Sequence, residues 1–145
     1  PAPDADLAQS AADALPALAR RPWKRLRQAV RALPDVPADE DLHAVRILAK
    51  HTRYAAEAAA PVMGRRARAF AGAVADVQTV LGDHQDACVT EDWLRAAAGS
   101  IADPGEAVLV GQLIGLQRAE AHDRRAAWPK AWKRAADPKL RDWVD

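Results

Sequence analysis

The chain has 145 residues, of which 50% are hydrophobic and 28% are charged, and its formal net charge is +1. This composition is typical of one globular, soluble domain over residues 1–145 and excludes an intrinsically disordered chain. No apolar run approaches the roughly 20 residues that span a bilayer, and the opening residues lack the basic segment of a signal peptide. The one cysteine, Cys88, cannot form an internal disulfide, so we expect a cytoplasmic protein without a membrane partner.

The alanine-rich composition, with seven glycines, favours helices throughout. In chain order, we expect helices over about residues 7–33, 39–60, 65–81, 83–99, 103–128 and 138–144. Asp39 and Asp83 are the expected N-caps of the second and fourth helices, and Gly82 is expected just past the end of the third. Proline is expected to kink or split the first helix and to interrupt the fifth, at Pro16, Pro22 and Pro129. The expected fold is therefore an all-α antiparallel bundle of about four to six helices.

Basic side chains recur on one face of the second expected helix. On a helical wheel, the face opposite the apolar positions carries His43, Arg46, Lys50, Arg53, Tyr54 and Glu57. A typical polar face mixes signs, because opposite charges four residues apart stabilise a helix and like charges destabilise it. The single-signed stripe therefore indicates a face that binds an anion, with an ordinary solvated face as the alternative.

Two other expected helices carry similar stripes. The first has Arg20, Lys24, Arg27 and Arg31, and the fifth has Arg118, His122 and Arg125. Gly111 and Gly115 continue the stripe of the fifth helix, where they allow close approach of a ligand or, equally well, of a neighbouring helix. Arginine suits phosphate because its planar fork donates two parallel hydrogen bonds. Converging stripes would form a basic trough.

The motifs of common enzymes are absent. The chain has no Walker loop, no GxGxxG, no HExxH and no CxxC, and its histidines are not spaced four apart on one helix. Capping explains Asp83 and Asp86 beside His84, and Cys88 is expected to pack as a small hydrophobic residue. The five tryptophans are expected mostly in the core and at helix ends, although Trp128 and Trp132 offer a weak base-stacking alternative. We therefore expect no catalytic site, cofactor or metal.

Two segments resemble a known family. "LHAVRILAKHTRYAAEAAAPVMG" and "VQTVLGDHQDACVTEDWL" are similar to the CHAD domain, the conserved-histidine α-helical domain, over about residues 42–95. The family pattern His-x-x-Arg-x-x-x-Lys-x-x-Arg-Tyr-x-x-Glu is filled by His43, Arg46, Lys50, Arg53, Tyr54 and Glu57. Its Leu-Gly-(Asp/Glu) turn, with an Asp three residues on, is matched by Leu81, Gly82, Asp83 and Asp86.

The resemblance implies a helical domain of two similar four-helix halves around a basic surface that binds inorganic polyphosphate without catalysis. It also implies a frequent companion domain of the CYTH type and association with polyphosphate granules. This chain resembles the C-terminal half alone, so we expect either a separate N-terminal half or a homodimer. His51 stands where the family commonly has Arg, which makes that contact weaker and dependent on pH.

The sequence thus predicts a non-enzymatic module that binds polyphosphate or related phosphate and sulfate anions. The expected contacts are Arg20, Lys24, Arg27, Arg31, His43, Arg46, Lys50, Arg53, Tyr54, Arg118, His122 and Arg125. A general nucleic-acid or nucleotide-phosphate binder is the first alternative. The second is a structural or oligomerising domain whose basic faces pair with acidic segments such as residues 83–92.

Overall fold

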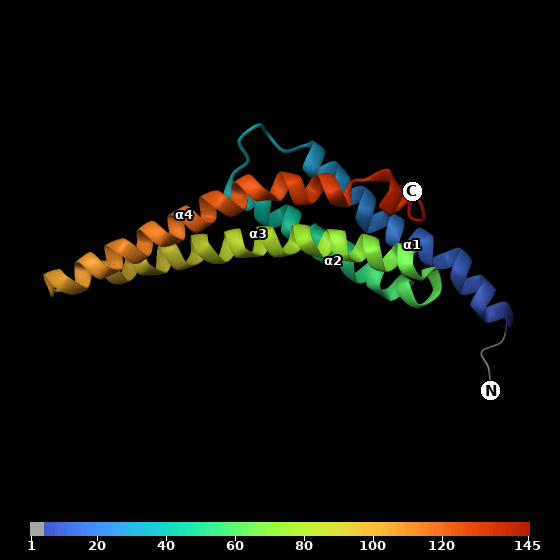
Figure 1. Ribbon diagram of the computed structural model, residues 1–145, viewed down its shortest axis with the longest axis horizontal. Coiled ribbons are helices and arrows are strands. Elements are labelled where there is room, and N and C mark those ends of the chain that lie inside the picture. Colours follow the sequence, from blue (N-terminus) through green and yellow to red (C-terminus); the bar gives the residue numbers. More distant parts are fainter. Residues whose placement is uncertain (1–4) are drawn as a thin grey trace.

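The computed structural model describes the backbone of residues 5–145 and the side chains of residues 14–145. It consists of helices, loops and turns, which confirms the all-α class (Figure 1). The helices are α1 (Ala5–Arg31), α2 (Asp39–Met63), α3 (Arg65–Ala98), α4 (Pro104–Ala135) and the short α5 (Pro138–Arg141). Among the described helices, none combines the length and the apolar character that crossing a membrane requires.

Helix α3 runs unbroken through the position where a boundary was expected. The predicted end at Leu81, the glycine turn at Gly82 and the cap at Asp83 are all wrong, because Gly82 and Asp83 lie inside α3. The only positive φ angle among described glycines is at Gly64, which separates α2 from α3. Buried side chains continue on both sides of the glycine, from Val77 to Ala87, and their packing outweighs the roughly 1 kcal/mol that glycine costs a helix.

The prolines likewise interrupt no helix. Helix α1 continues through Pro16 and Pro22, and α4 continues through Pro129 to Ala135. A proline removes one backbone hydrogen bond, which a long helix held by tertiary contacts can tolerate. The expected split of the first helix and the expected end of the fifth near Trp128 are therefore wrong.

The start of α2 differs from the expectation by one residue. The N-cap is Ala38, whose N–H donates to the Asp41 carboxylate over 3.0 Å, and not Asp39. The expected acids in the first turn are present and complement the helix dipole. Because Asp41 serves the backbone, the carboxylate of Asp39 is left to contact other helices.

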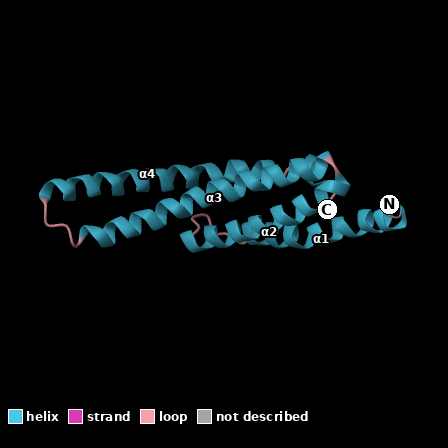
Figure 2. Cartoon of the chain, turned by 90° about the horizontal axis from the view of Figure 1, so that it is seen from below, coloured by secondary structure: helices cyan, strands magenta, loops and turns pink. Residues whose placement is uncertain are grey.

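The long helices pack as successive neighbours along the chain. Extensive contacts join α1 to α2, α2 to α3 and α3 to α4, while α5 contacts α3. Figures 1 and 2 show that one half of the α3–α4 hairpin extends beyond α1 and α2. The core therefore lies in the other half, where all of the long helices overlap.

Aromatic rings form the centre of this core. The Trp23 ring lies edge-on to Phe70 at 5.1 Å between centroids, and it also contacts Trp132 at 5.5 Å. Phe70 packs in turn against Trp143 at 5.9 Å. Edge-to-face geometry favours such pairs beyond the area that they bury. These contacts join α1, α3, α4 and the segment after α5.

The projecting part of the hairpin carries apolar side chains that the chain itself does not cover. Their exposed fractions lie between 45% and 67%, at Val89, Trp93, Val108, Leu109, Leu113 and Leu116. Trp93 was expected among the core and helix-end tryptophans, and its exposure corrects that expectation. An apolar patch of this kind is unusual on an isolated domain.

Replacement of Phe70 by Ala should lower the free energy of unfolding by about 3–5 kcal/mol, because it opens a cavity under two tryptophans. Urea denaturation monitored by circular dichroism measures the change. The control is Leu18→Ala on α1, whose side chain is 67% exposed and which should change stability by about 0.5 kcal/mol or less. Equal losses in the two variants would contradict the assigned core.

Candidate anion-binding site

The basic stripe of α2 lies opposite the helix face that packs in the core. Val45, Ala49 and Thr52 are buried, as the helical wheel predicts, and the Thr52 hydroxyl donates to the Leu48 carbonyl over 2.8 Å. That bond satisfies the one polar group on the packing face. Ala44 is exposed, although the wheel assigned it to the packing face.

Tyr54 organises the neighbouring cations on this stripe. The Arg53 guanidinium carbon lies 4.8 Å from the centroid of the Tyr54 ring, and the Lys50 ammonium lies 5.8 Å from it. Both distances are within reach of a cation–π attraction. The ring therefore holds two like charges on the same side of α2, while His43, one turn before Arg46, is exposed.

Arg46 explains why a glycine occurs inside α3. A Cβ atom on Gly82 would lie only 3.2 Å from the Arg46 Nε and 3.7 Å from one terminal guanidinium nitrogen. The missing side chain therefore makes room for the guanidinium to lie against α3. Gly82 therefore belongs to the contact between α2 and α3 rather than to a turn.

Two arginine donors on this face lack acceptors among the described residues. The Nε atoms of Arg46 and Arg53 are buried without a hydrogen bond, and Arg53 approaches Glu57 only at 3.6 Å. The Gln78 side-chain oxygen is likewise buried and unpaired. A buried donor without an acceptor costs about 1–3 kcal/mol, so each of these unpaired atoms lowers the stability of this packing.

The four side chains expected in the stripe of α1 all line one hollow. Together with Trp23 and Asp145, they line a depression of about 250 Å³. Arg20 donates to the Val144 carbonyl over 3.2 Å, and Arg27 pairs with the Asp145 carboxylate at 3.3 Å. Lys24 and Arg31 are exposed, and neither has an ion-pair partner among the described residues. The C-terminal segment thus occupies part of the stripe.

A second basic hollow lies between α1 and α2, and the expected stripes did not include it. Arg21, Arg25 and His51 line a depression of about 350 Å³ together with Leu48. Arg21 and Arg25 lie off the regular stripe of α1 and are not among the expected contacts. His51, the departure from the family pattern, is their neighbour in space.

The stripe of α4 is engaged with acids of the same chain. Arg118 pairs with Glu91 at 2.9 Å, and Arg125 pairs with Asp39, while His122 is exposed. Two other α4 arginines contact α3 acids, in the pairs Arg124–Asp83 at 3.6 Å and Arg134–Asp76 at 2.8 Å. Acids of α3 therefore neutralise much of α4, whereas the α2 stripe has its ion pair, Arg53–Glu57 at 3.6 Å, within its own helix.

The three stripes consequently have different surroundings. That of α1 lies beside the C-terminal segment, that of α2 lies against α3, and that of α4 lies against α3 and the start of α2. One continuous trough built from all three stays a prediction. Among the described residues, Lys24 and Arg31 of α1 are exposed and carry no ion pair, whereas Arg46, Lys50 and Arg53 of α2 are partly buried and Arg53 pairs with Glu57 of the same helix.

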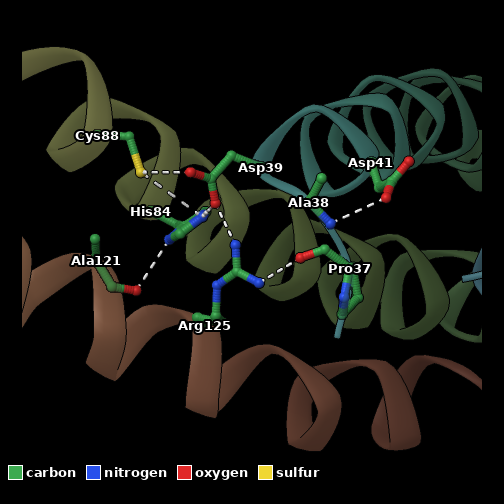
Figure 3. Close-up of polar contacts among 8 residues, drawn as sticks. All are labelled: Pro37, Ala38, Asp39, Asp41, His84, Cys88, Ala121 and Arg125. Atoms are coloured by element: carbon green, nitrogen blue, oxygen red, sulfur yellow. Dashed lines mark hydrogen bonds and ion pairs between the residues drawn. The ribbon is translucent and has the colours of Figure 1, made fainter. Parts of the chain in front are cut away.

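A polar cluster ties the start of α2 to α3 and α4 (Figure 3). His84 is 2% exposed, with Nδ1 2.9 Å from the Ala121 carbonyl and Nε2 2.9 Å from the Asp39 carboxylate. The Ala121 carbonyl can only accept, so Nδ1 donates to it. Arg125 donates to the same carboxylate and to the Pro37 carbonyl.

Cys88 completes this cluster. Burial and neighbouring charges shift the pKa values of both Cys88 and Asp39. Burial raises the pKa of Asp39, but hydrogen bonds from His84 and Arg125 outweigh it and hold that pKa below the usual value. Burial and the nearby Asp39 carboxylate raise the pKa of the Cys88 thiol to about 11. The thiol is therefore protonated and weakly reactive at neutral pH.

The fold and these faces define a class of protein, an all-α bundle whose helices carry basic faces. The arginines of α4 pair with acids of α3. Residues 1–95 match the CHAD domain family, and the chain belongs to that family. It is 30% identical over 142 residues to the uncharacterized proteins Rv2226 and MT2285 of Mycobacterium tuberculosis strains H37Rv and CDC 1551. Each alignment covers 92% of this chain and 26% of the relative, so the chain spans about a quarter of their length. No solved structure matches.

Replacement of Gly82 by Ala should fail to give the stability that alanine normally adds to a helix, because the new Cβ displaces Arg46. Gly72→Ala is the matched control on α3, since a Cβ there meets nothing within 4 Å. We expect Gly72→Ala to raise the free energy of unfolding by about 0.5–1 kcal/mol. Urea denaturation of both variants measures the difference, and equal stabilisation would contradict the packing of Arg46 on Gly82.

The lowered pKa of Asp39 makes its contribution to stability dependent on pH. A depressed folded-state pKa stabilises the fold above the unfolded pKa of about 3.9 and loses that effect as pH falls through the folded value. The difference in unfolding free energy between the wild type and Asp39→Asn should therefore be largest near neutral pH and shrink below about pH 4. Asp92→Asn, at an exposed carboxylate, is the control. A difference independent of pH would contradict the role of Asp39.

Proposed function

We propose that this chain is a non-catalytic binding module for inorganic polyphosphate, with the stripe of α2 as its principal contact. One observation carries the proposal. Among the described residues, Arg46, Lys50 and Arg53 follow one another on α2 with one ion pair, Arg53–Glu57 at 3.6 Å within the same helix, whereas α4 arginines form ion pairs with α3. Membership of the CHAD family supports the same ligand.

The spacing of these cations suits a linear polyanion. At 1.5 Å per residue, the stretch from Arg46 to Arg53 extends about 10 Å along the helix, so an extended phosphate chain lying along α2 meets a cation at each turn. Arginine forks bind phosphate oxygens in pairs, and His43 and Tyr54 add further donors. Binding would release counterions from the polyanion and weaken steeply with salt.

The remaining expected contacts extend the proposed surface onto neighbouring helices. On α1 they are Arg20, Lys24, Arg27 and Arg31, and on α4 they are Arg118, His122 and Arg125. Because Arg118 and Arg125 already pair with Glu91 and Asp39, their contribution requires that the ligand compete with those acids. Lys24 and Arg31 are exposed and carry no such requirement.

A nucleic-acid ligand has less support. Trp128 is buried and Trp132 packs on Trp23, so neither is free to stack on a base. The Tyr54 ring is occupied by Lys50 and Arg53. A ligand that offers phosphates without bases therefore suits this surface better.

We also propose that a partner covers the exposed apolar side chains of the α3–α4 hairpin. Its candidates are a second copy of the chain and an N-terminal CHAD half, with a CYTH-type domain elsewhere in the parent protein. The large share of the relatives' length outside the aligned region supports further domains. We place this assembly in the cytoplasm and at polyphosphate granules.

Replacement of Arg46, Lys50 and Arg53 together by Glu should weaken polyphosphate binding about 100-fold or more, because three charge-assisted contacts become repulsive. Isothermal titration at one fixed salt concentration measures the affinity, and circular dichroism checks that helicity is retained. The control reverses Lys130, Lys133 and Lys139, which are exposed, lie outside the proposed surface and change the net charge equally. Equal losses in both variants would show non-specific attraction and contradict the site.

Competition separates the two phosphate ligands in the same assay. Single-stranded DNA of equal charge should displace polyphosphate only at clearly higher concentration. Displacement at equal concentration would favour the general nucleic-acid binder. Incubation of polyphosphate with the chain should release no orthophosphate, and release would overturn the non-catalytic assignment.

A further inference from the structure

We propose that Asp39, His84 and Cys88 form a binding site for a divalent transition-metal ion, with Zn²⁺ the best fit. Figure 3 shows their side chains directed toward one another from α2 and α3, and one ligand atom of each lies within 4.8 Å of the others. A carboxylate oxygen, an imidazole nitrogen and a thiolate sulfur are donors that zinc takes in proteins. The site is separate from the basic stripe of α2 and does not depend on the ligand proposed for it.

The spacing of the donors is close to that of a tetrahedral complex. The Cys88 Sγ lies 3.7 Å from Asp39 Oδ2 and 3.8 Å from His84 Nε2, and His84 Nε2 lies 2.9 Å from Asp39 Oδ1. Tetrahedral angles and zinc bond lengths of about 2.0–2.3 Å put such donors about 3.3–3.6 Å apart. The Cys88 and His84 distances are to different oxygens of Asp39, so the carboxylate would turn to present one oxygen to the ion, and the Sγ–Nε2 distance would shorten by about 0.2–0.5 Å.

The surroundings of His84 are those of a metal-binding histidine. Its Nδ1 lies 2.9 Å from the Ala121 carbonyl, to which it must donate, and this leaves the Nε2 lone pair directed into the cluster when the ring is neutral. Cys88 follows His84 by four residues, so both side chains lie on one face of α3. The sequence contained this His-x-x-x-Cys spacing, but a search for paired histidines alone overlooked it.

The cluster also has an opening through which an ion can enter. A hollow of about 260 Å³ is lined by Asp39 and Cys88 together with Glu40, His43 and Asp92. Asp39 and Cys88 line this hollow and the buried His84 does not, so water would reach the fourth position of a tetrahedral ion from the side of Asp39 and Cys88. Arg125 contacts Asp39 Oδ1, the same oxygen that lies beside His84 Nε2, and its charge opposes a cation there. The acids Glu40 and Asp92, which line the hollow, offset that charge.

Binding exchanges protons for the ion. Without metal, the His84 ring donates to Asp39 through Nε2, and Cys88 carries its thiol proton. The ion takes the Nε2 lone pair and the thiolate, and both protons pass to solvent. Arg125 retains its contact with Asp39 and positions the carboxylate.

Titration of the purified chain with Co²⁺, followed by displacement with Zn²⁺ against a chromogenic chelator, tests the site. We expect thiolate-to-cobalt charge-transfer absorption and intense visible bands of a tetrahedral complex. Cys88→Ser should remove the charge-transfer absorption and weaken Zn²⁺ binding more than about 10-fold, because outer partners of metal ligands alone cost 10–100-fold. His84→Gln should weaken binding similarly.

His122→Gln is the matched control, since His122 is an exposed histidine outside the cluster and should leave the titration unchanged. Cys88 is only half-buried, so Cys88→Ser decides the question even if His84→Gln does not fold. Two results would overturn the site. One is a wild type that shows no charge-transfer band, and the other is a Cys88→Ser variant that binds Zn²⁺ as tightly as the wild type does.

Discussion

The rest of the structure depends on the unbroken 34-residue helix α3, on which α2, α4 and α5 all pack. Its opposite sides have different chemistry. Toward α2 it presents Gly82, where the absence of a side chain admits Arg46. Toward α4 it presents acids that pair with arginines at Asp76, Asp83 and Glu91. One helix therefore pairs its acids with arginines of α4 and leaves room at Gly82 for Arg46 of α2.

The buried His84 links this arrangement to the start of α2. It contacts an α4 carbonyl on one side and the Asp39 carboxylate on the other, so three helices meet at a single ring. Buried polar groups of this kind favour one relative placement of the helices, since every alternative leaves a donor unpaired. The same ring, carboxylate and thiol meet the donor requirements of a metal ion. Structural linkage and metal binding thus use the same atoms in different protonation states.

Sequence reasoning failed where local signals opposed tertiary packing. Gly82 followed by Asp83 is an ordinary helix-end signal, yet buried residues continue across it and α3 does not end. Pro129 is an ordinary stop signal, yet Trp128 and Ala135 are buried on both sides of it and α4 continues. Glycine and proline carry local costs of about 1 and 3 kcal/mol, and the burial of neighbouring turns exceeds them.

The sequence by itself determined the helical class, the apolar face of α2 and the basic stripe opposite that face, because these follow from residue spacing along one helix. It also carried the family pattern that the CHAD match confirms. Only the tertiary structure decided which cations have acidic partners, that Arg46 lies against Gly82, and that Asp39, His84 and Cys88 meet. Those facts depend on the rotation and register of one helix against another, and periodicity within a single helix contains no information about either.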